Sequence, residues 1–211
     1  ELLLSRETRF AVGSSGVTRA LVMAWQASGA VAAPGTLSQA SEVDRLLVVS
    51  GSCSPVTARQ IARGMAEGYA GVRADVPALL NGETAEEARL IEAAEAALAV
   101  GGRCVIRSAD GPLGDAAPAA GDRLGVALGR VAHEIIRRQR LSRVLFAGGD
   151  TSSHGIAELG IDALTWAAPL APGAPLVRAH AGEAAVDGLE LVLKGGQMGD
   201  DGFFETVRRG R

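Results

Sequence analysis

The sequence predicts an α/β domain with a mostly parallel sheet, helices on both faces, and some antiparallel strands in its last third. Through the first two thirds of the chain, apolar runs of strand length alternate with segments of helical period. That alternation is typical of strands joined by crossover helices. In the last third, strand-like runs follow one another across Pro- and Gly-containing turns. Without a helix between them, neighbouring strands there can run antiparallel.

The strands are predicted from short apolar runs, and the clearest is Arg45–Ser50, which contains the continuous apolar run Leu46–Val49. A continuous run of this kind is typical of a strand that is buried on both faces. The expected strands are Phe10–Gly13, Arg45–Ser50, Val72–Val76, Arg103–Arg107, Arg143–Ala147, Ala163–Ala168, Leu176–His180 and Leu189–Lys194.

The helices are predicted from periodicity and from residues that suit helix ends. Pro55 suits a first helical turn, Asp122 is expected to cap its helix, and Gly160 should end a short one. The expected helices are Val17–Ser28, Pro55–Gly68, Thr84–Val100, Asp122–Arg140, Ser153–Leu159 and Asp201–Arg209, with a linker at Gly29–Ser41 and a loop at Ser108–Gly121.

Composition excludes several classes of protein. The net charge is −3, there is no Lys/Arg-rich run, and only seven residues are aromatic (one Tyr, two Trp and four Phe), so a nucleic-acid binder is not expected. Cys53 and Cys104 form no C-x-x-C pair, which predicts neither a zinc site nor a disulfide framework and fits a cytoplasmic setting. No apolar stretch is long enough to predict a membrane span.

Glycine-rich, polar segments follow four of the expected strands. They are Gly13–Gly16, Gly51–Ser54, Gly148–Ser153 and Gly195–Gly199. Ligands of open α/β sheets bind at the carboxyl ends of the strands, where glycine allows close approach to an anion and the next helix offers free N–H groups. Any one loop is better explained as a tight turn with a serine cap, and none matches the P-loop or dinucleotide motifs. Four at equivalent places predict a phosphate cradle.

Some polar residues in or near these loops have two interpretations. Asp150 is expected either to coordinate Mg²⁺ or accept a substrate proton, or to cap the next helix. Lys194 could neutralise phosphate charge or be a solvated residue at a strand end. Asp200 and Asp201 are expected first as complements to a helix dipole. No metal site is predicted from the histidines, and the roles of His154 and His180 stay open.

Four motifs in series resemble one family. Leu46–Ile61 (LLVVSGSCSPVTARQI), Phe146–Ile161 (FAGGDTSSHGIAELGI), Ala171–Leu176 (APGAPL) and Leu193–Glu205 (LKGGQMGDDGFFE) are similar to the nucleotide-binding C-terminal domain of the four-carbon acid sugar kinases. The resemblance runs from about Arg45 to the C-terminus. It identifies residues 41–211 as a nucleotide-binding domain, and residues 1–40 as the tail of the family's N-terminal, substrate-binding domain plus a linker.

The resemblance implies an ATP- and Mg²⁺-dependent kinase that phosphorylates a hydroxyl of a small sugar acid such as threonate, erythronate or a 3-oxo form. This chain would supply mainly the nucleotide-binding half, its own N-terminal domain would be a partner, and a homodimer is left open. By motif match, the nucleotide-binding residues would be Ser52, Ser54, Gly148, Gly149, Asp150, Thr151, Gly195, Gly196 and Gly199, with Asp150 as the catalytic residue.

Met198 stands where many members of the family have phenylalanine, which leaves the substrate open, with a branched or oxidised sugar acid among the alternatives. Two alternatives stay open. One is another phosphate-handling enzyme, a phosphosugar isomerase or a dehydrogenase, for which Asp75 is the only candidate acid for a ribose. The other is a non-catalytic module that binds a nucleotide or sugar phosphate.

Overall fold

The computed structural model describes residues 12–32, 35, 39–109 and 118–211. The chain divides into two compact units, Glu1–Leu37 and Ser38–Arg211. In the first unit, helix α1 (Ser15–Ala27) has no buried residue. Of the strand expected at Phe10–Gly13, the first two residues lie outside the described residues, and Val12 and Gly13 are not in a strand.

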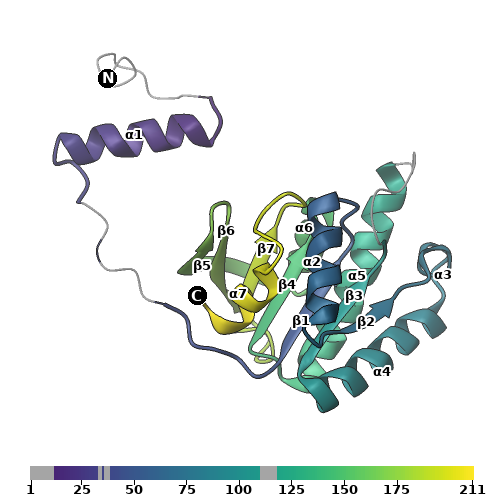
Figure 1. Ribbon diagram of the computed structural model, residues 1–211. Coiled ribbons are helices and arrows are strands. Elements are labelled where there is room, and N and C mark those ends of the chain that lie inside the picture. The colour runs from purple at the N-terminus through teal and green to yellow at the C-terminus, as the bar shows by residue number, and fades with distance from the viewer. Residues whose placement is uncertain (1–11, 33–34, 36–38, 110–117) are drawn as a thin grey trace. The chain divides into compact units, whose positions relative to one another are not determined.

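The second unit contains seven strands and six described helices (Figure 1). The strands are β1 (Leu46–Ser50), β2 (Ala70–Arg73), β3 (Arg103–Arg107), β4 (Arg143–Ala147), β5 (Ile161–Ala171), β6 (Ala174–Ala181) and β7 (Glu190–Lys194). The helices are α2 (Pro55–Ala66), α3 (Val76–Leu80), α4 (Thr84–Gly101), α5 (Pro118–Gln139), α6 (Gly149–Glu158) and α7 (Phe203–Arg209).

All seven strands form one sheet in the order β2-β3-β1-β4-β7-β6-β5. β2, β3, β1, β4 and β7 are parallel. At one side of the sheet, β6 pairs antiparallel with β7, and β5 pairs antiparallel with β6. The predicted fold class is therefore confirmed, including the antiparallel strands of the last third. The order also places β7 directly beside β4, with Lys194 opposite Ala147. In the sequence, α6 and the β5–β6 hairpin separate these two strands.

β1 is buried along its whole length because helices cover both faces of the sheet. Leu47 and Val49 point into a core shared with α4 and α5, whereas Leu46 and Val48 point into a second core shared with α2 and α7. Side chains alternate between the faces of a strand, so one apolar run supplies both cores. Figure 1 shows α2 and α7 on one side of the sheet and α5 on the other.

Three helix starts of the second unit differ from the prediction. α5 begins at Pro118, so Asp122 lies inside the helix and is not its cap. α6 begins at Gly149, four residues earlier than expected, because Asp150, Thr151 and the serines continue the helical turn. α7 begins only at Phe203, since Asp200 Oδ1 accepts a hydrogen bond from Gly202 N (3.0 Å) and holds the preceding residues in a turn.

A further helix was missed where β2 ends early. The predicted strand Val72–Val76 stops at Arg73, and the short helix α3 follows it. Asp75 is the reason, because its Oδ1 accepts a hydrogen bond from Ala78 N (3.1 Å) as an N-cap. Pro77 then occupies the first helical turn, where its missing N–H has no consequence.

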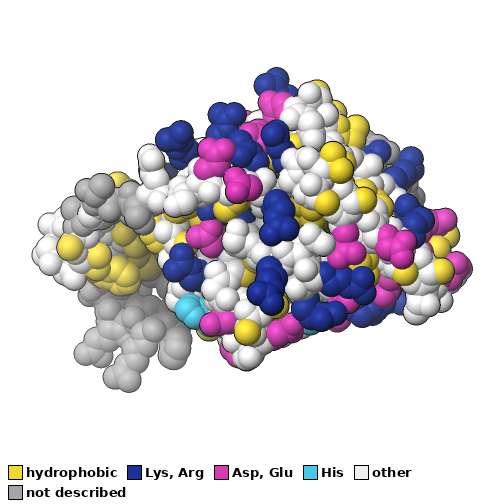
Figure 2. All heavy atoms as spheres, turned by 90° about the horizontal axis from the view of Figure 1, so that it is seen from below, with side chains coloured by type: hydrophobic (Ala, Val, Ile, Leu, Met, Phe, Trp, Pro, Cys, Tyr) yellow, Lys and Arg dark blue, Asp and Glu magenta, His cyan; other side chains and the backbone are white. Residues whose placement is uncertain are grey.

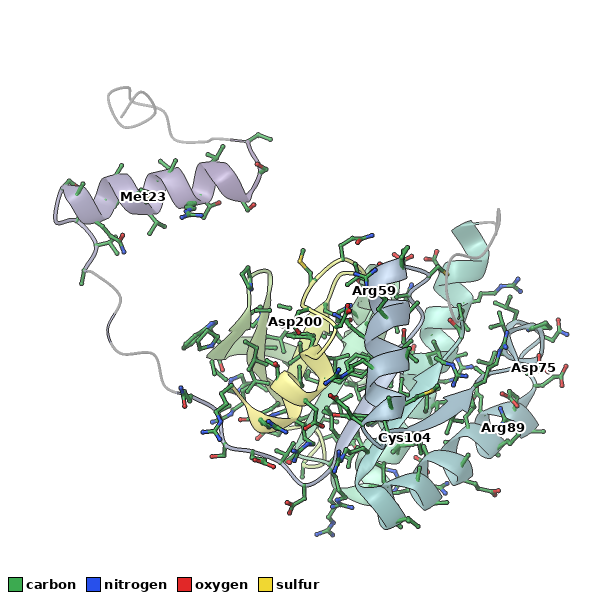
Figure 3. All side chains as sticks on the ribbon, in the orientation of Figure 1. Met23, Arg59, Asp75, Arg89, Cys104 and Asp200 are labelled. Carbon is green, nitrogen blue, oxygen red and sulfur yellow. The ribbon has the colours of Figure 1, made fainter. Side chains whose placement is uncertain are left out.

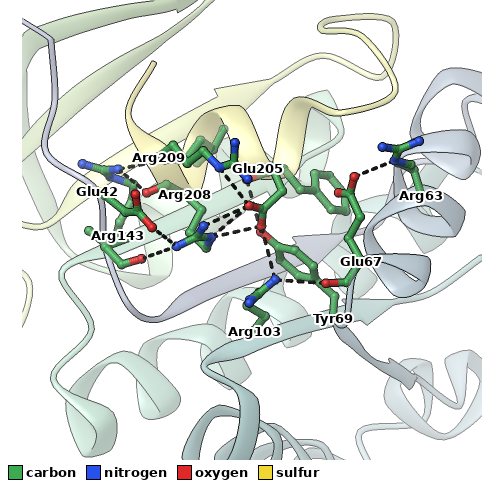
Figure 4. A network of polar contacts seen from close by, with 12 residues as sticks. Glu42, Arg63, Glu67, Tyr69, Arg103, Arg143, Glu205, Arg208 and Arg209 are labelled. Atoms are coloured by element: carbon green, nitrogen blue, oxygen red, sulfur yellow. Dashed lines mark hydrogen bonds and ion pairs between the residues drawn. The ribbon is translucent and has the colours of Figure 1, made fainter.

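A polar network fastens α7 to the sheet at the end away from the glycine loops (Figure 4). The fully buried Arg143 donates to Glu190 (Nε to Oε2, 2.9 Å) and to the carbonyl oxygen of Val207 (2.8 Å). Glu205 Oε1 accepts hydrogen bonds from Arg208 Nε (3.0 Å) and from the Tyr69 hydroxyl (3.2 Å). Although burial opposes it, the pairing with Arg208 keeps the pKa of Glu205 below its usual value.

Among the described residues, no helix is both long enough and apolar enough to cross a membrane. Both cysteines are free. On the face that Figure 2 shows, arginines lie interspersed with aspartates and glutamates rather than gathered in one patch.

Candidate nucleotide site

Three of the four predicted loops meet at one edge of the sheet. β1, β4 and β7 are adjacent and parallel, so the segments that follow them leave the sheet side by side. They are Gly51–Ser54 before α2, Gly148 before α6, and Gly195–Gly202 before α7. The fourth, Gly13–Gly16, belongs to the first unit of the chain.

The contacts that a Cβ atom would make at two glycines, Gly51 and Gly196, show how closely these loops approach one another. A Cβ atom at Gly196 would lie 2.7 Å from Ser54 Cβ and 2.9 Å from Ser52 Oγ, and one at Gly51 would overlap Thr151 Oγ1. Contacts under 3.0 Å do not occur for real Cβ atoms. Larger residues at Gly51 and Gly196 would therefore push the three loops apart.

Gly148 joins β4 to α6 in a conformation that other residues rarely adopt, with φ at +120°. Its N–H donates to the Lys194 carbonyl (2.9 Å), which continues the pairing of β4 with β7. No side chain caps α6, so the N–H groups of Gly149, Asp150 and Thr151 are left at the positive end of the helix dipole. This is the arrangement in which helix N-termini receive phosphates.

The serines and Asp150 divide into two groups by what they bind. Ser54 Oγ accepts from Val56 N (3.2 Å) and caps α2, and Ser52 Oγ accepts from Ser54 N (3.2 Å). These bonds hold the first loop in shape. Asp150 is exposed in the first turn of α6, two residues past the N-cap position at Gly148, so the expectation that it caps the helix is wrong. Its carboxylate stays available to a ligand at this edge.

Two residues of α2 that lie in none of the predicted loops hold the last loop. Thr57 Oγ1 donates to the Gly196 carbonyl (3.0 Å), and Gln60 Nε2 donates to the carbonyls of Met198 (3.0 Å) and Asp200 (2.8 Å). Both side chains are fully buried. Thr57 and Gln60 stand three residues apart on the same helix face as Ile61, so polar residues on an otherwise apolar face were the available signal.

Lys194 lies beneath this loop. Its side chain is fully buried, and its Nζ donates to Thr57 Oγ1 (3.0 Å) and lies 3.4 Å from the Gly196 carbonyl. Burial lowers the pKa of Lys194 from 10.5 to about 8. The interpretation of Lys194 as a solvated residue is therefore wrong.

An open hollow of about 640 Å³ borders the site between α2 and the last loop. Its lining comprises Val56, Arg59, Arg63, Gly199, Asp200, Asp201 and Gly202. Figure 3 shows Arg59 and Asp200 on this side of the sheet. Arg59 and Asp201 form an exposed ion pair (3.0 Å) across the hollow. At Gly199, φ is +78° and a Cβ atom would lie 2.5 Å from Phe203 Cγ, so glycine is required for the turn.

The histidines and Asp75 have other contacts. His154 Nε2 lies 3.3 Å from Asp122 Oδ1 where α6 packs on α5, and His180 Nε2 lies 2.9 Å from Thr165 Oγ1 in the β5–β6 hairpin. Asp75 follows β2, which β3 separates from β1. In the parts of the chain that the structure describes, no three His, Cys, Asp or Glu side chains gather as a metal site.

Comparison with known proteins identifies the family of this domain. The family model described as "nucleotide-binding C-terminal domain" matches residues 47–204, so this chain belongs to that family of nucleotide-binding domains. More particularly, it belongs with the C-terminal domains of the four-carbon acid sugar kinase family, to which its curated relatives also point.

Two curated relatives carry kinase names. A 3-oxo-isoapionate kinase of Paraburkholderia graminis is 41% identical over 96% of this chain and 46% of its own length. A 3-oxo-tetronate kinase of Cupriavidus necator is 30% identical over 93% of this chain and 45% of its own length. The chain thus spans about half the length of the curated relatives that it matches.

Two solved structures share the fold. A Haemophilus influenzae protein is 24% identical with a TM-score of 0.65, over 88% of this chain and 44% of that one. A Bordetella bronchiseptica domain of unknown function, solved with bound citrate as a domain-swapped dimer, is 22% identical with a TM-score of 0.67. It covers 81% of this chain and 43% of that one.

Proposed function

We propose that this chain is the nucleotide-binding half of an ATP-dependent kinase that phosphorylates a hydroxyl of a small sugar acid. The observation that carries the proposal is the meeting of the loops after β1, β4 and β7 at one sheet edge, within contact of one another. Phosphoryl transfer depends mostly on positioning and on electrostatic stabilisation, and loops that offer free N–H groups at a helix start supply both.

The site residues are proposed with distinct roles. The N–H groups of Gly149, Asp150 and Thr151 would receive phosphate oxygens at the start of α6, which Gly148 positions, while Ser52 and Ser54 shape the facing loop. Gly195, Gly196 and Gly199 would let the last loop approach the nucleotide. The part of the nucleotide beyond the phosphates would lie in the hollow beside α2. These roles fit the uncapped helix start and the space left by the glycines.

Asp150 is the residue that would hold Mg²⁺ or accept a proton. Mg²⁺ is usually held by one or two carboxylates together with substrate phosphates, and Asp150 is an exposed carboxylate at the phosphate edge. The ion would neutralise charge on the transferred phosphoryl group. The protein itself orients the phosphates and keeps the carboxylate beside them.

A 3-oxo sugar acid is the proposed substrate class, because the relatives are named for 3-oxo-isoapionate and 3-oxo-tetronate. Residues 1–40 would be the end of a substrate-binding domain and its linker, and residues 41–211 the nucleotide-binding domain. The dehydrogenase alternative loses its candidate acid, since the Asp75 carboxylate caps α3. A homodimer and a cytoplasmic location stay predictions.

Two measurements test the proposal. Calorimetry of this chain with Mg-ADP and Mg-ATP should detect binding, and the chain alone should phosphorylate no sugar acid. The longer protein should phosphorylate 3-oxo-isoapionate or 3-oxo-tetronate, in a panel of four- and five-carbon sugar acids, at the expense of ATP. If this chain binds no nucleotide, the proposal is contradicted. If the longer protein binds nucleotide but transfers phosphate to no sugar acid, the non-catalytic module is favoured.

A further inference from the structure

Lys194 differs from every other basic residue of the chain. The sequence has 21 lysines and arginines, and Lys194 is the only lysine among them. It is also fully buried, at the end of β7 directly below the Gly195–Gly196 turn. Burying a cation is costly unless a partner compensates its charge, so this position requires an explanation.

Arg143, the other fully buried cation of the described residues, shows how such a charge is normally compensated. Arg143 pairs with Glu190 and fills its other donors with backbone carbonyls. Lys194 has only the Thr57 hydroxyl and the Gly196 carbonyl as hydrogen-bond partners. Within the described residues no carboxylate lies within ion-pair distance of it. The ammonium is therefore held by neutral groups alone.

We propose that Lys194 is a positioning residue for the nucleotide phosphates. It holds the Gly195–Gly196 turn through Thr57, and the phosphate charge of the bound nucleotide compensates its buried ammonium. This inference rests on the proposed function, since it needs a phosphate at the edge formed by the three loops. Lysine suits the role because its charge is compact on an unbranched stem, whereas the planar guanidinium of arginine needs several acceptors.

The surroundings leave the phosphate as the missing counter-charge. The charged side chains on α2, on α6 and on the last loop are Arg59, Arg63, Asp150, Glu158, Asp200 and Asp201. Arg63 pairs with Glu67. Arg59 and Asp201 pair with each other, and Asp200 accepts from Gly202 N. None of them affects the pKa of Lys194, which burial alone lowers. A nearby anion would favour the charged form and raise that pKa again.

The first experiment compares Lys194→Met with the wild-type chain. Methionine keeps the stem and removes the charge. We expect Mg-ADP affinity to fall at least about tenfold, while the midpoint of urea unfolding stays unchanged or rises because a buried charge is gone. Arg143→Met is the matched control for a compensated buried cation, and it should lower the unfolding midpoint. Thr57→Val should weaken Mg-ADP binding, whereas Thr57→Ser, which keeps the hydroxyl, should restore it.

The second experiment uses the wild-type chain and needs no variant. Because the chain has one lysine, lysine labelled with ¹³C at Cε gives one side-chain NMR signal that reports this residue. We expect the signal to titrate near pH 8 in the free protein and at least about one unit higher with Mg-ADP. Adenosine, which has no phosphate, should leave the titration unchanged.

The outcomes separate this inference from the function on which it rests. If the wild-type chain binds no Mg-ADP, both are wrong. If it binds Mg-ADP but Lys194→Met binds equally well, or if the lysine signal titrates at the same pH with and without Mg-ADP, the nucleotide proposal survives and the role of Lys194 is wrong. A lower unfolding midpoint for Lys194→Met together with an unshifted lysine signal would make Lys194 a purely structural residue.

Discussion

The side-chain amide of Gln60 lies 2.8 Å from the carbonyl oxygen of Asp200 and also donates to the carbonyl of Met198, 3.0 Å away. One buried side chain thus fastens the loop before α7 to the middle of α2. The loop borders the proposed phosphate site, so the shape of that site depends on a residue that no glycine motif would suggest.

Gln60→Leu should weaken both nucleotide binding and the fold. The change leaves two loop carbonyls without their donor, which typically costs about 1–3 kcal/mol of unfolding free energy. We expect Mg-ADP affinity to fall roughly tenfold as the loop loses its restraint. Calorimetry and urea unfolding measure the two quantities. Gln139→Leu, on α5 and away from the loops, should leave binding unchanged. Equal binding by Gln60→Leu would contradict the role of the clamp.

Gly196→Ala should open the site by steric overlap. The added Cβ atom would lie 2.7 Å from Ser54 Cβ, so the first and last loops must separate by several tenths of an ångström. We expect Mg-ADP affinity to fall at least about tenfold, with an unfolding cost of about 1–3 kcal/mol from overpacking. Gly182→Ala is the matched control, since nothing lies within 4 Å of its added Cβ atom. Comparable affinity in both variants would show that the loops do not need this contact.

Asp150→Asn in the longer protein should lower turnover more than ATP affinity. The amide keeps the size of the side chain but loses the charge that would hold Mg²⁺ or accept a proton, and such groups contribute about 10²–10⁴-fold to rate. Steady-state kinetics with a 3-oxo sugar acid would give kcat and KM separately. Asp162→Asn, an exposed carboxylate at the start of β5, should change neither. Unchanged turnover in Asp150→Asn would assign Asp150 to the helix dipole alone.

Burial of Lys194 should make stability depend on pH in a defined window. Its pKa is lowered from 10.5 to about 8 in the folded state, so between these values the unfolded chain binds more protons than the folded chain. The free energy of unfolding then rises with pH, at a slope of at most about 1 kcal/mol per pH unit from this residue. Urea unfolding of wild type and Lys194→Met is measured from pH 7 to 10.5. Cys104 and Tyr69 are present in both proteins, so the difference in unfolding free energy between them reports Lys194 alone. A constant difference across that range would contradict it.

Local pattern predicted the elements well where burial was symmetrical. The runs at Leu46–Ser50 and Arg143–Ala147 could be recognised as buried strands because both of their faces meet cores. The starts of α2 and α4 were predicted correctly. Prediction failed at the starts of α5, α6 and α7 and missed α3, because one or two hydrogen bonds decide where a helix begins. Asp75 caps a helix that follows an apolar run, and Asp122 does not cap the helix in which it lies.

What the sequence by itself determined is the alternation of strands and helices, the presence of flexible glycine segments at strand ends, and the family to which the motifs belong. Tertiary structure alone decided which of those segments form a site. The strand order places β7 next to β4 and moves β5 and β6 outward, because the packing of long-range apolar faces, not chain order, sets neighbours in a sheet. The same packing buries Lys194 under Thr57 and places Gln60 against the last loop. Such contacts join residues more than a hundred positions apart, and no local periodicity contains them.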